Sequence, residues 1–135
     1  MVGRMSDGDG RDRWERGVGA YASQLGLSPD EAAAWFRERY GERFAEEAIN
    51  AAGGAWVDDV LSPRDRSLVV VATLATLGGA EDRLRTHVRW ALEHGSSRAE
   101  LEALVALLAV YVGYPRASVA MEVVREELAR SDDAA

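Results

Sequence analysis

Apolar side chains recur along this chain mostly at the three- and four-residue spacing of amphipathic helices. The first such stripe, in a helix that we expect to begin at residue 11, consists of Trp14, Val18, Tyr21 and Leu25. A second start follows at Ser28-Pro29-Asp30-Glu31, where serine can cap a helix, proline suits its first turn and glutamate completes a capping box. The pattern continues to the end signal Gly53-Gly54, with Gly41 as a point where the helix can be interrupted.

The same start signal returns at Ser62-Pro63-Arg64-Asp65, ahead of a very apolar stretch. Residues Leu68–Leu77 are apolar on almost every face, which is typical of a helix at the centre of a fold or between subunits. A buried strand is the alternative, because the three valines of this run favour β structure. The length of the run and its capping signal favour a helix over Arg66–Leu77.

Three further helices are indicated before the C-terminus. Glu81–Glu93 is amphipathic and ends near a glycine. Ser97-Arg98-Ala99-Glu100 is another capping box, and the helix that it opens is apolar nearly all round as far as Val112. Gly113-Tyr114-Pro115 predicts a break before a last helix over Arg116–Arg130.

These patterns predict an all-α fold of five to seven helices. We expect a single compact domain over residues 11–130, between a flexible leader at 1–10 and a frayed tail at 131–135. Two helices that are apolar on all sides are more than the core of one small monomer would bury, so we also expect a homo-oligomer.

The composition excludes several classes of chemistry. The 135 residues include no cysteine, which excludes disulfides, iron–sulfur clusters and thiolate catalysis. The basic residues are 16 arginines without a lysine, which excludes a Schiff base on a lysine amine. A net charge of -7 disfavours nucleic-acid binding, because such a surface repels phosphates.

The chain shows no sign of a membrane partner. Its longest apolar runs are about a dozen residues, too short to cross a bilayer. The polar, glycine-rich N-terminus lacks the hydrophobic region of a secretory signal. We therefore expect a cytoplasmic protein.

His87 is the strongest candidate for chemistry. It follows Leu84 by three residues and precedes Ala91 by four, so it shares the inward face of its helix. An imidazole titrates near neutral pH, which suits proton transfer, but buried histidines are also common as hydrogen-bonded core residues. His94, beside Gly95, is expected at the C-terminal dipole of the same helix. No second histidine or acid completes a metal-ligand spacing with His87, so we expect no metal.

Arg66 and Arg89 are candidates for holding a carboxylate, which a guanidinium grips with two charge-assisted hydrogen bonds. For any single arginine, an exposed position with weak ion pairs is the alternative. Ser67 can donate a hydrogen bond, but the sequence places no base beside it that would make it a nucleophile. Trp56 and Tyr111 could line a pocket, although aromatic residues at such positions also occur in plain cores.

Four segments carry a family pattern: Leu61–Leu68 (LSPRDRSL), Ala75–Gly78 (ATLG), Thr86–Leu92 (THVRWAL) and Tyr111–Pro115 (YVGYP). The opening RWERG at Arg13–Gly17 fits the same pattern. In this order and spacing they resemble the 4-carboxymuconolactone decarboxylase family. The resemblance covers nearly the whole chain after the leader.

The related alkyl hydroperoxidase D-type proteins share the fold of this family but work through a C-x-x-C pair ahead of the matching histidine. In this chain Ala80 and Arg83 stand seven and four residues before His87. A thiol peroxidase is therefore excluded.

The resemblance implies an all-α subunit of the alkyl hydroperoxidase D-like type, assembled into trimers or hexamers with sites near subunit interfaces. It also implies a carboxy-lyase without a cofactor, acting on a small carboxylate or lactone in aromatic compound catabolism. The family reaction removes CO2 from a carboxylated butenolide and gives 3-oxoadipate enol-lactone.

The same resemblance implies roles for individual residues. Arg66 or Arg89 would hold the carboxylates of the substrate. Ser67 or a backbone N–H would stabilise the enolate oxygen, and His87 would deliver one proton.

Some positions depart from the family pattern. Ala55 and Asp58 stand where the pattern has a glutamate before the tryptophan and an arginine two residues after it. An anion in place of a cation adds repulsion toward an anionic substrate. The family's NNG is Glu93-His94-Gly95 here, and one residue is inserted at Gly78-Gly79. These changes bear on the substrate more than on the fold.

Three functions stay open on this sequence. The first is the decarboxylase of a carboxylated lactone. The second is an isomerase or cyclase for another small oxygenated substrate, in secondary metabolism, whose pocket would contain His87 without a cationic clamp. The third is a non-catalytic binding or assembly protein, in which His87 would be packed in an apolar core.

Overall fold

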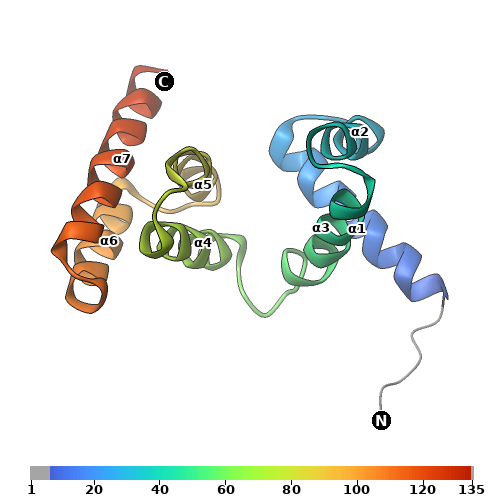
Figure 1. Cartoon of the computed structure of the whole chain (residues 1–135), viewed down its shortest axis with the longest axis horizontal. Coiled ribbons are helices and arrows are strands. Elements are labelled where there is room, and N and C mark those ends of the chain that lie inside the picture. Colours follow the sequence, from blue (N-terminus) through green and yellow to red (C-terminus); the bar gives the residue numbers. More distant parts are fainter. Residues whose placement is uncertain (1–6, 135) are drawn as a thin grey trace, which may run out of the picture. The chain divides into compact units, whose positions relative to one another are not determined.

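The structure, a computed structural model, describes residues 7–134 and is shown in Figure 1. Within these residues it contains helices and no strand, which confirms the predicted all-α fold. The seven helices are α1 (Asp7–Leu25), α2 (Pro29–Tyr40), α3 (Glu42–Ala55), α4 (Pro63–Leu77), α5 (Glu81–Glu93), α6 (Arg98–Val112) and α7 (Tyr114–Asp133). The apolar run over residues 68–77 is thus helical, and the strand alternative is wrong.

The helices group into two compact units, divided in the sequence between Val60 and Leu61. The first unit contains α1, α2 and α3, and the second contains α4 to α7 (blue to teal and green to red in Figure 1). The division falls inside the range 11–130 that we expected to form one domain.

The first unit follows the local signals of its sequence. The Ser28 hydroxyl accepts a hydrogen bond from the Glu31 N–H (3.2 Å), and the Glu31 carboxylate accepts one from the Ser28 N–H (3.3 Å). This is the predicted capping box of α2. Gly41, with a φ of 83°, separates α2 from α3 at the predicted point of interruption. The core of the unit consists of Val18, Ala22, Ala32, Ala33, Phe36, Ala45 and Ile49.

Two glycines allow α1 and α3 to pack closely. A Cβ atom added to Gly17 would lie 1.8 Å from the carbonyl oxygen of Ile49. One added to Gly53 would lie 1.8 Å from the carbonyl oxygen of Arg13. The two helices can therefore pack this closely only because glycine has no side chain.

Two helices of the second unit, α4 and α6, also begin at capping serines. The hydroxyls of Ser62 and Ser97 accept hydrogen bonds from the N–H groups of Asp65 and Glu100, each at 3.1 Å. All four helices contribute to one core. Its buried residues are Val71, Ala75, Leu84, Val88, Ala91, Leu101, Val105, Ala109, Ala117, Ala120, Val123, Val124 and Leu128.

The helical region extends beyond the predicted boundaries at both ends. α1 begins at Asp7, so residues 7–10 are helical and not part of a leader, while the predicted leader over 1–6 lies outside the described residues. α7 begins at Tyr114 and not at Arg116, because Pro115 fits the first turn of a helix and Gly113 takes a φ of 90°. It continues to Asp133, into the predicted tail.

α6 carries apolar side chains on two sides. The buried ones are Leu101, Val105 and Ala109. The exposed ones include Leu107, Val110 and Tyr111. This exposed side is the feature on which the expected homo-oligomer depends, since contiguous apolar surface marks a contact region. None of the helices described here is long and apolar enough to cross a bilayer.

Candidate functional site

α5 presents two flanks beside the residues that it buries, which are Leu84, Val88 and Ala91. Successive residues of a helix are rotated by about 100°, so side chains three and four apart share a side. The histidine flank, as we call it, consists of Arg83, His87, Trp90 and, just past the helix end, His94. The arginine flank consists of Arg85 and Arg89.

His87 lies at the edge of the buried face of α5, half-buried against Trp90. The two rings pack edge to face, with centroids 4.7 Å apart and an angle of 82° between their planes. Burial of the imidazole, and secondly the positive charge of Arg83, lower the pKa of His87 from 6.5 to about 4. The ring is therefore neutral at pH 7, able to donate one hydrogen bond and to accept another.

Ser67 and His94 form a pair that joins α4 to the histidine flank. The Ser67 side chain is completely buried, and its Oγ lies 2.6 Å from Nδ1 of His94, in hydrogen-bond contact. The main chain of His94 is held as well, because its N–H donates to the carbonyl oxygen of Trp90 (2.9 Å). His94 ends α5, where the sequence places it, but its side-chain partner is a new finding.

Sequence reasoning missed this partner, and no local signal could have revealed it. Ser67 and His94 are 27 positions apart and meet only because α4 packs against α5. No base adjoins Ser67 in the sequence, but in the structure the imidazole of His94 does.

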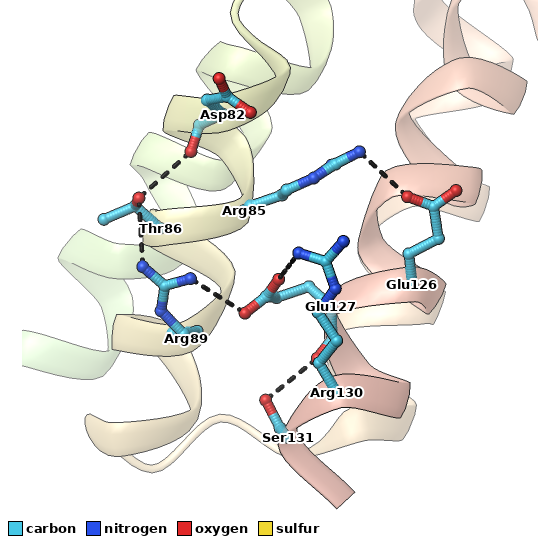
Figure 2. A network of polar contacts seen from close by, with 8 residues as sticks. All are labelled: Asp82, Arg85, Thr86, Arg89, Glu126, Glu127, Arg130 and Ser131. Atoms are coloured by element: carbon cyan, nitrogen blue, oxygen red, sulfur yellow. Dashed lines mark hydrogen bonds and ion pairs between the residues drawn. The ribbon is translucent and has the colours of Figure 1, made fainter. Parts of the chain in front are cut away.

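The arginine flank faces α7, and acidic side chains of α7 form ion pairs with it (Figure 2). One guanidinium nitrogen of Arg89 donates to Oε1 of Glu127 (3.1 Å), and another donates to the Thr86 hydroxyl (3.3 Å). Glu127 is only 2% exposed, and Arg130 lies 3.7 Å from its other oxygen. Arg85 forms a separate pair with Glu126 at 2.9 Å.

The predicted site residues lie on several different elements of the structure. Arg66 precedes Ser67 on α4 and is half-buried, so it belongs to the element that contacts the histidine flank. Arg89 lies on the opposite flank of α5, against Glu127. Tyr111 is 79% exposed on α6, and Trp56 caps the C-terminal end of α3 in the first unit.

Two cavities of the second unit are lined by none of these residues. One of about 10 Å³, room for about one water molecule, is lined by Leu74, Leu84 and Val123 among others. An open hollow of about 460 Å³ is lined by Val112, Pro115, Arg116 and Val119. No cluster of three histidine or acidic side chains suited to a metal occurs in residues 7–134.

Comparisons with known proteins bear directly on this arrangement. A sequence model of the carboxymuconolactone decarboxylase family matches residues 42–126, which is more than half of the chain and includes all of α4, α5 and α6. A 4-carboxymuconolactone decarboxylase from Acinetobacter baylyi is 37% identical over 74 residues. That match covers 55% of this chain and 54% of the relative, so it spans about half the length of each.

Proposed function

Because the chain belongs to the carboxymuconolactone decarboxylase family, we propose that it is a cofactor-free carboxy-lyase that removes CO2 from a small carboxylated lactone. The observation that carries the proposal is the half-buried His87, set between Arg83 and Trp90 on one flank of α5. The absence of cysteine rules out the thiol peroxidase chemistry of the related alkyl hydroperoxidase D-type proteins.

The chemistry of such a substrate explains why no cofactor is required. The leaving carboxylate sits on a carbon that is conjugated through a C=C bond to the lactone carbonyl. When the C–C bond to the carboxylate breaks, the electron pair spreads into a dienolate and CO2 leaves. The protein then has to hold the carboxylates, stabilise the enolate oxygen and supply one proton to carbon.

Neutral His87 is suited to the second of these tasks, which is to stabilise the enolate oxygen. At a pKa of about 4 the imidazolium form is rare at pH 7, so His87 would seldom hold a proton to give away. Its ring N–H can instead donate a hydrogen bond to the oxygen on which negative charge develops, which stabilises the transition state more than the ground state.

Of the two predicted carboxylate clamps, the position of Arg66 on α4, the helix that contacts the histidine flank, supports its role. This arginine comes from α4 beside Ser67, whose hydroxyl contacts the histidine flank. The guanidinium of Arg89 is engaged by Glu127 and Thr86 on the other flank. The roles of Trp56, which follows α3, and of Tyr111 on α6 stay separate predictions.

The second candidate is an isomerase or cyclase acting on another small oxygenated substrate. The ion pair between Arg89 and Glu127 favours it, because such an enzyme needs no second cation for a carboxylate. Ala55 and Asp58, in place of the family's glutamate and arginine, point the same way. Both candidates use His87.

Incubation with 4-carboxymuconolactone tests the first proposal. We expect CO2 release without any added cofactor, a loss of 100-fold or more in kcat/KM for His87→Phe, which removes the ring N–H, and no change for Glu122→Gln, an exposed position on α7. If the folded protein, verified by circular dichroism, releases no CO2, the decarboxylase is wrong for this lactone. A product of unchanged mass but altered absorbance would support the second candidate.

A further inference from the structure

A proton donor to carbon is still required, and the Ser67–His94 pair has the geometry of one. Ser67 is completely buried, so a substrate cannot reach its hydroxyl, yet that hydroxyl lies 2.6 Å from Nδ1 of His94. With Nδ1 occupied, Nε2 on the opposite side of the ring is the nitrogen left to exchange a proton with another molecule.

A hydroxyl partner suits a ring that changes its protonation state. When His94 is neutral with its proton on Nε2, Ser67 donates its O–H to Nδ1. When His94 is protonated, Nδ1–H donates to the Ser67 oxygen, and the hydroxyl hydrogen can turn to a carbonyl one turn back along α4. The ring thus keeps its position in both states.

The surrounding main chain fixes the backbone of His94. The N–H of His94 donates to the carbonyl oxygen of Trp90, and Gly95, with a φ of 101°, ends the helix directly after it. His94 follows His87 by two helical turns, about 10 Å along the axis, on the same flank. The two rings can therefore act on different parts of one bound molecule, but they cannot pass a proton directly.

We infer that His94 donates the proton to the dienolate carbon, and that Ser67 is the positioning residue that holds its Nδ1. This inference rests on the proposed decarboxylase. The electron pair left by CO2 takes the proton from Nε2 of protonated His94, and the neutral ring regains a proton from water. The family pattern has asparagine at this position, so the role belongs to this chain and not to the family at large.

Replacing His94 by asparagine or by glutamine tests its two ring nitrogens one at a time. The amide of His94→Asn reaches the position of Nδ1 and keeps a partner for Ser67, but it places nothing at Nε2. His94→Gln reaches the position of Nε2 but leaves Ser67 without a partner. Neither amide can donate a proton as an acid. Glu93→Gln, an exposed neighbour, is the matched control.

We expect His94→Asn to lower kcat for 4-carboxymuconolactone by 100-fold or more, with KM within twofold and an unchanged Tm. His94→Gln is expected to lower both kcat and Tm, so it tests the same role if the asparagine variant does not fold. Ser67→Ala is expected to lower kcat by about tenfold. In nitrogen-15 NMR spectra it should turn His94 from one tautomer into a mixture of two.

The possible failures are distinguishable. Wild-type protein that releases no CO2 overturns the proposed function and this inference with it. An active wild type with an equally active His94→Asn variant overturns only the inference and leaves His94 a structural residue. If Ser67→Ala changes neither kcat nor the tautomer, the positioning role of Ser67 is wrong.

Discussion

Burial and the positive charge of Arg83 both disfavour protonation of the His87 imidazole. The folded-state pKa of about 4 lies below the ordinary value of 6.5, so between these values the unfolded chain binds a proton that the folded chain does not. The free energy of unfolding therefore falls as the pH is lowered from 6.5 to 4. The loss attributable to His87 between pH 7 and pH 4.5 is about 2 kcal/mol.

Urea denaturation at these two pH values measures the effect. His87→Gln cannot titrate and should lose about 2 kcal/mol less stability on acidification than the wild type. The other residues are identical in the two proteins, so their contributions cancel in the difference. Equal losses in the two proteins would mean that the pKa of His87 is not lowered by folding.

Between elements, the closest approach in the first unit is that of α1 to α3 at Gly17. An alanine there would place its Cβ 1.8 Å from the carbonyl oxygen of Ile49, so the helices would have to move apart. We expect Gly17→Ala to destabilise the protein by about 2 kcal/mol or more, as overpacking does. Gly19→Ala, two residues on with nothing within 4 Å, should instead stabilise α1 by up to about 1 kcal/mol. Thermal unfolding compares the two, and a stable Gly17→Ala variant would contradict the close packing.

The contact of α5 with α7 contains two neighbouring glutamates that differ in burial. Glu127 is buried between Arg89 and Arg130, whereas Glu126 pairs with Arg85 from an exposed position (Figure 2). Glu127→Gln removes the charge that both arginines face, and we expect it to cost about 1–3 kcal/mol in urea denaturation. Glu126→Gln should cost less than about 1 kcal/mol, as exposed pairs do. Equal costs would show that burial of Glu127 adds nothing to the pair.

The start of a helix could be predicted from the sequence, but the side-chain contacts between helices could not. Ser28 and Ser97 cap helices through N–H groups only three residues away, so a short stretch of sequence contains the whole signal. The partners Ser67 and His94 are 27 positions apart, and Arg89 and Glu127 are 38 apart. Which of these side chains meet depends on how α5 packs against α4 and α7, and no local pattern encodes that packing.

The candidate site was predictable to the same extent. His87 could be singled out, because its spacing from Leu84 and Ala91 reports its helical face. The pairing of Arg89 with Glu127 could not be predicted, because a charged residue two positions beyond His87 can pair with any neighbouring helix. The family resemblance supplied residue identities but carried no information about His94, where this chain departs from the pattern.

At the scale of the whole molecule, exposed apolar side chains occur on several elements, and α6 carries some of them on one side. Leu107 and Val110 lie three residues apart, and Tyr111 follows Val110 directly, so one side of the helix is exposed and apolar. The opposite side buries Leu101, Val105 and Ala109 in the second unit. A helix that is apolar on both sides requires two packing partners. We predict that a second copy of the chain covers the exposed side in a trimer or hexamer.

Val110→Asp tests this prediction, because an aspartate in an apolar interface loses its hydration without gaining a partner. Size-exclusion chromatography with light scattering should give an oligomer for the wild type and a monomer for the variant. The helical circular dichroism should be unchanged, since Val110 is 71% exposed in the single chain and does not belong to its core. Ser118→Asp, an exposed position on α7, adds the same charge and should leave the oligomer intact. A monomeric wild type, or a Val110→Asp variant that stays oligomeric, would contradict the assignment of this side of α6 to the subunit contact.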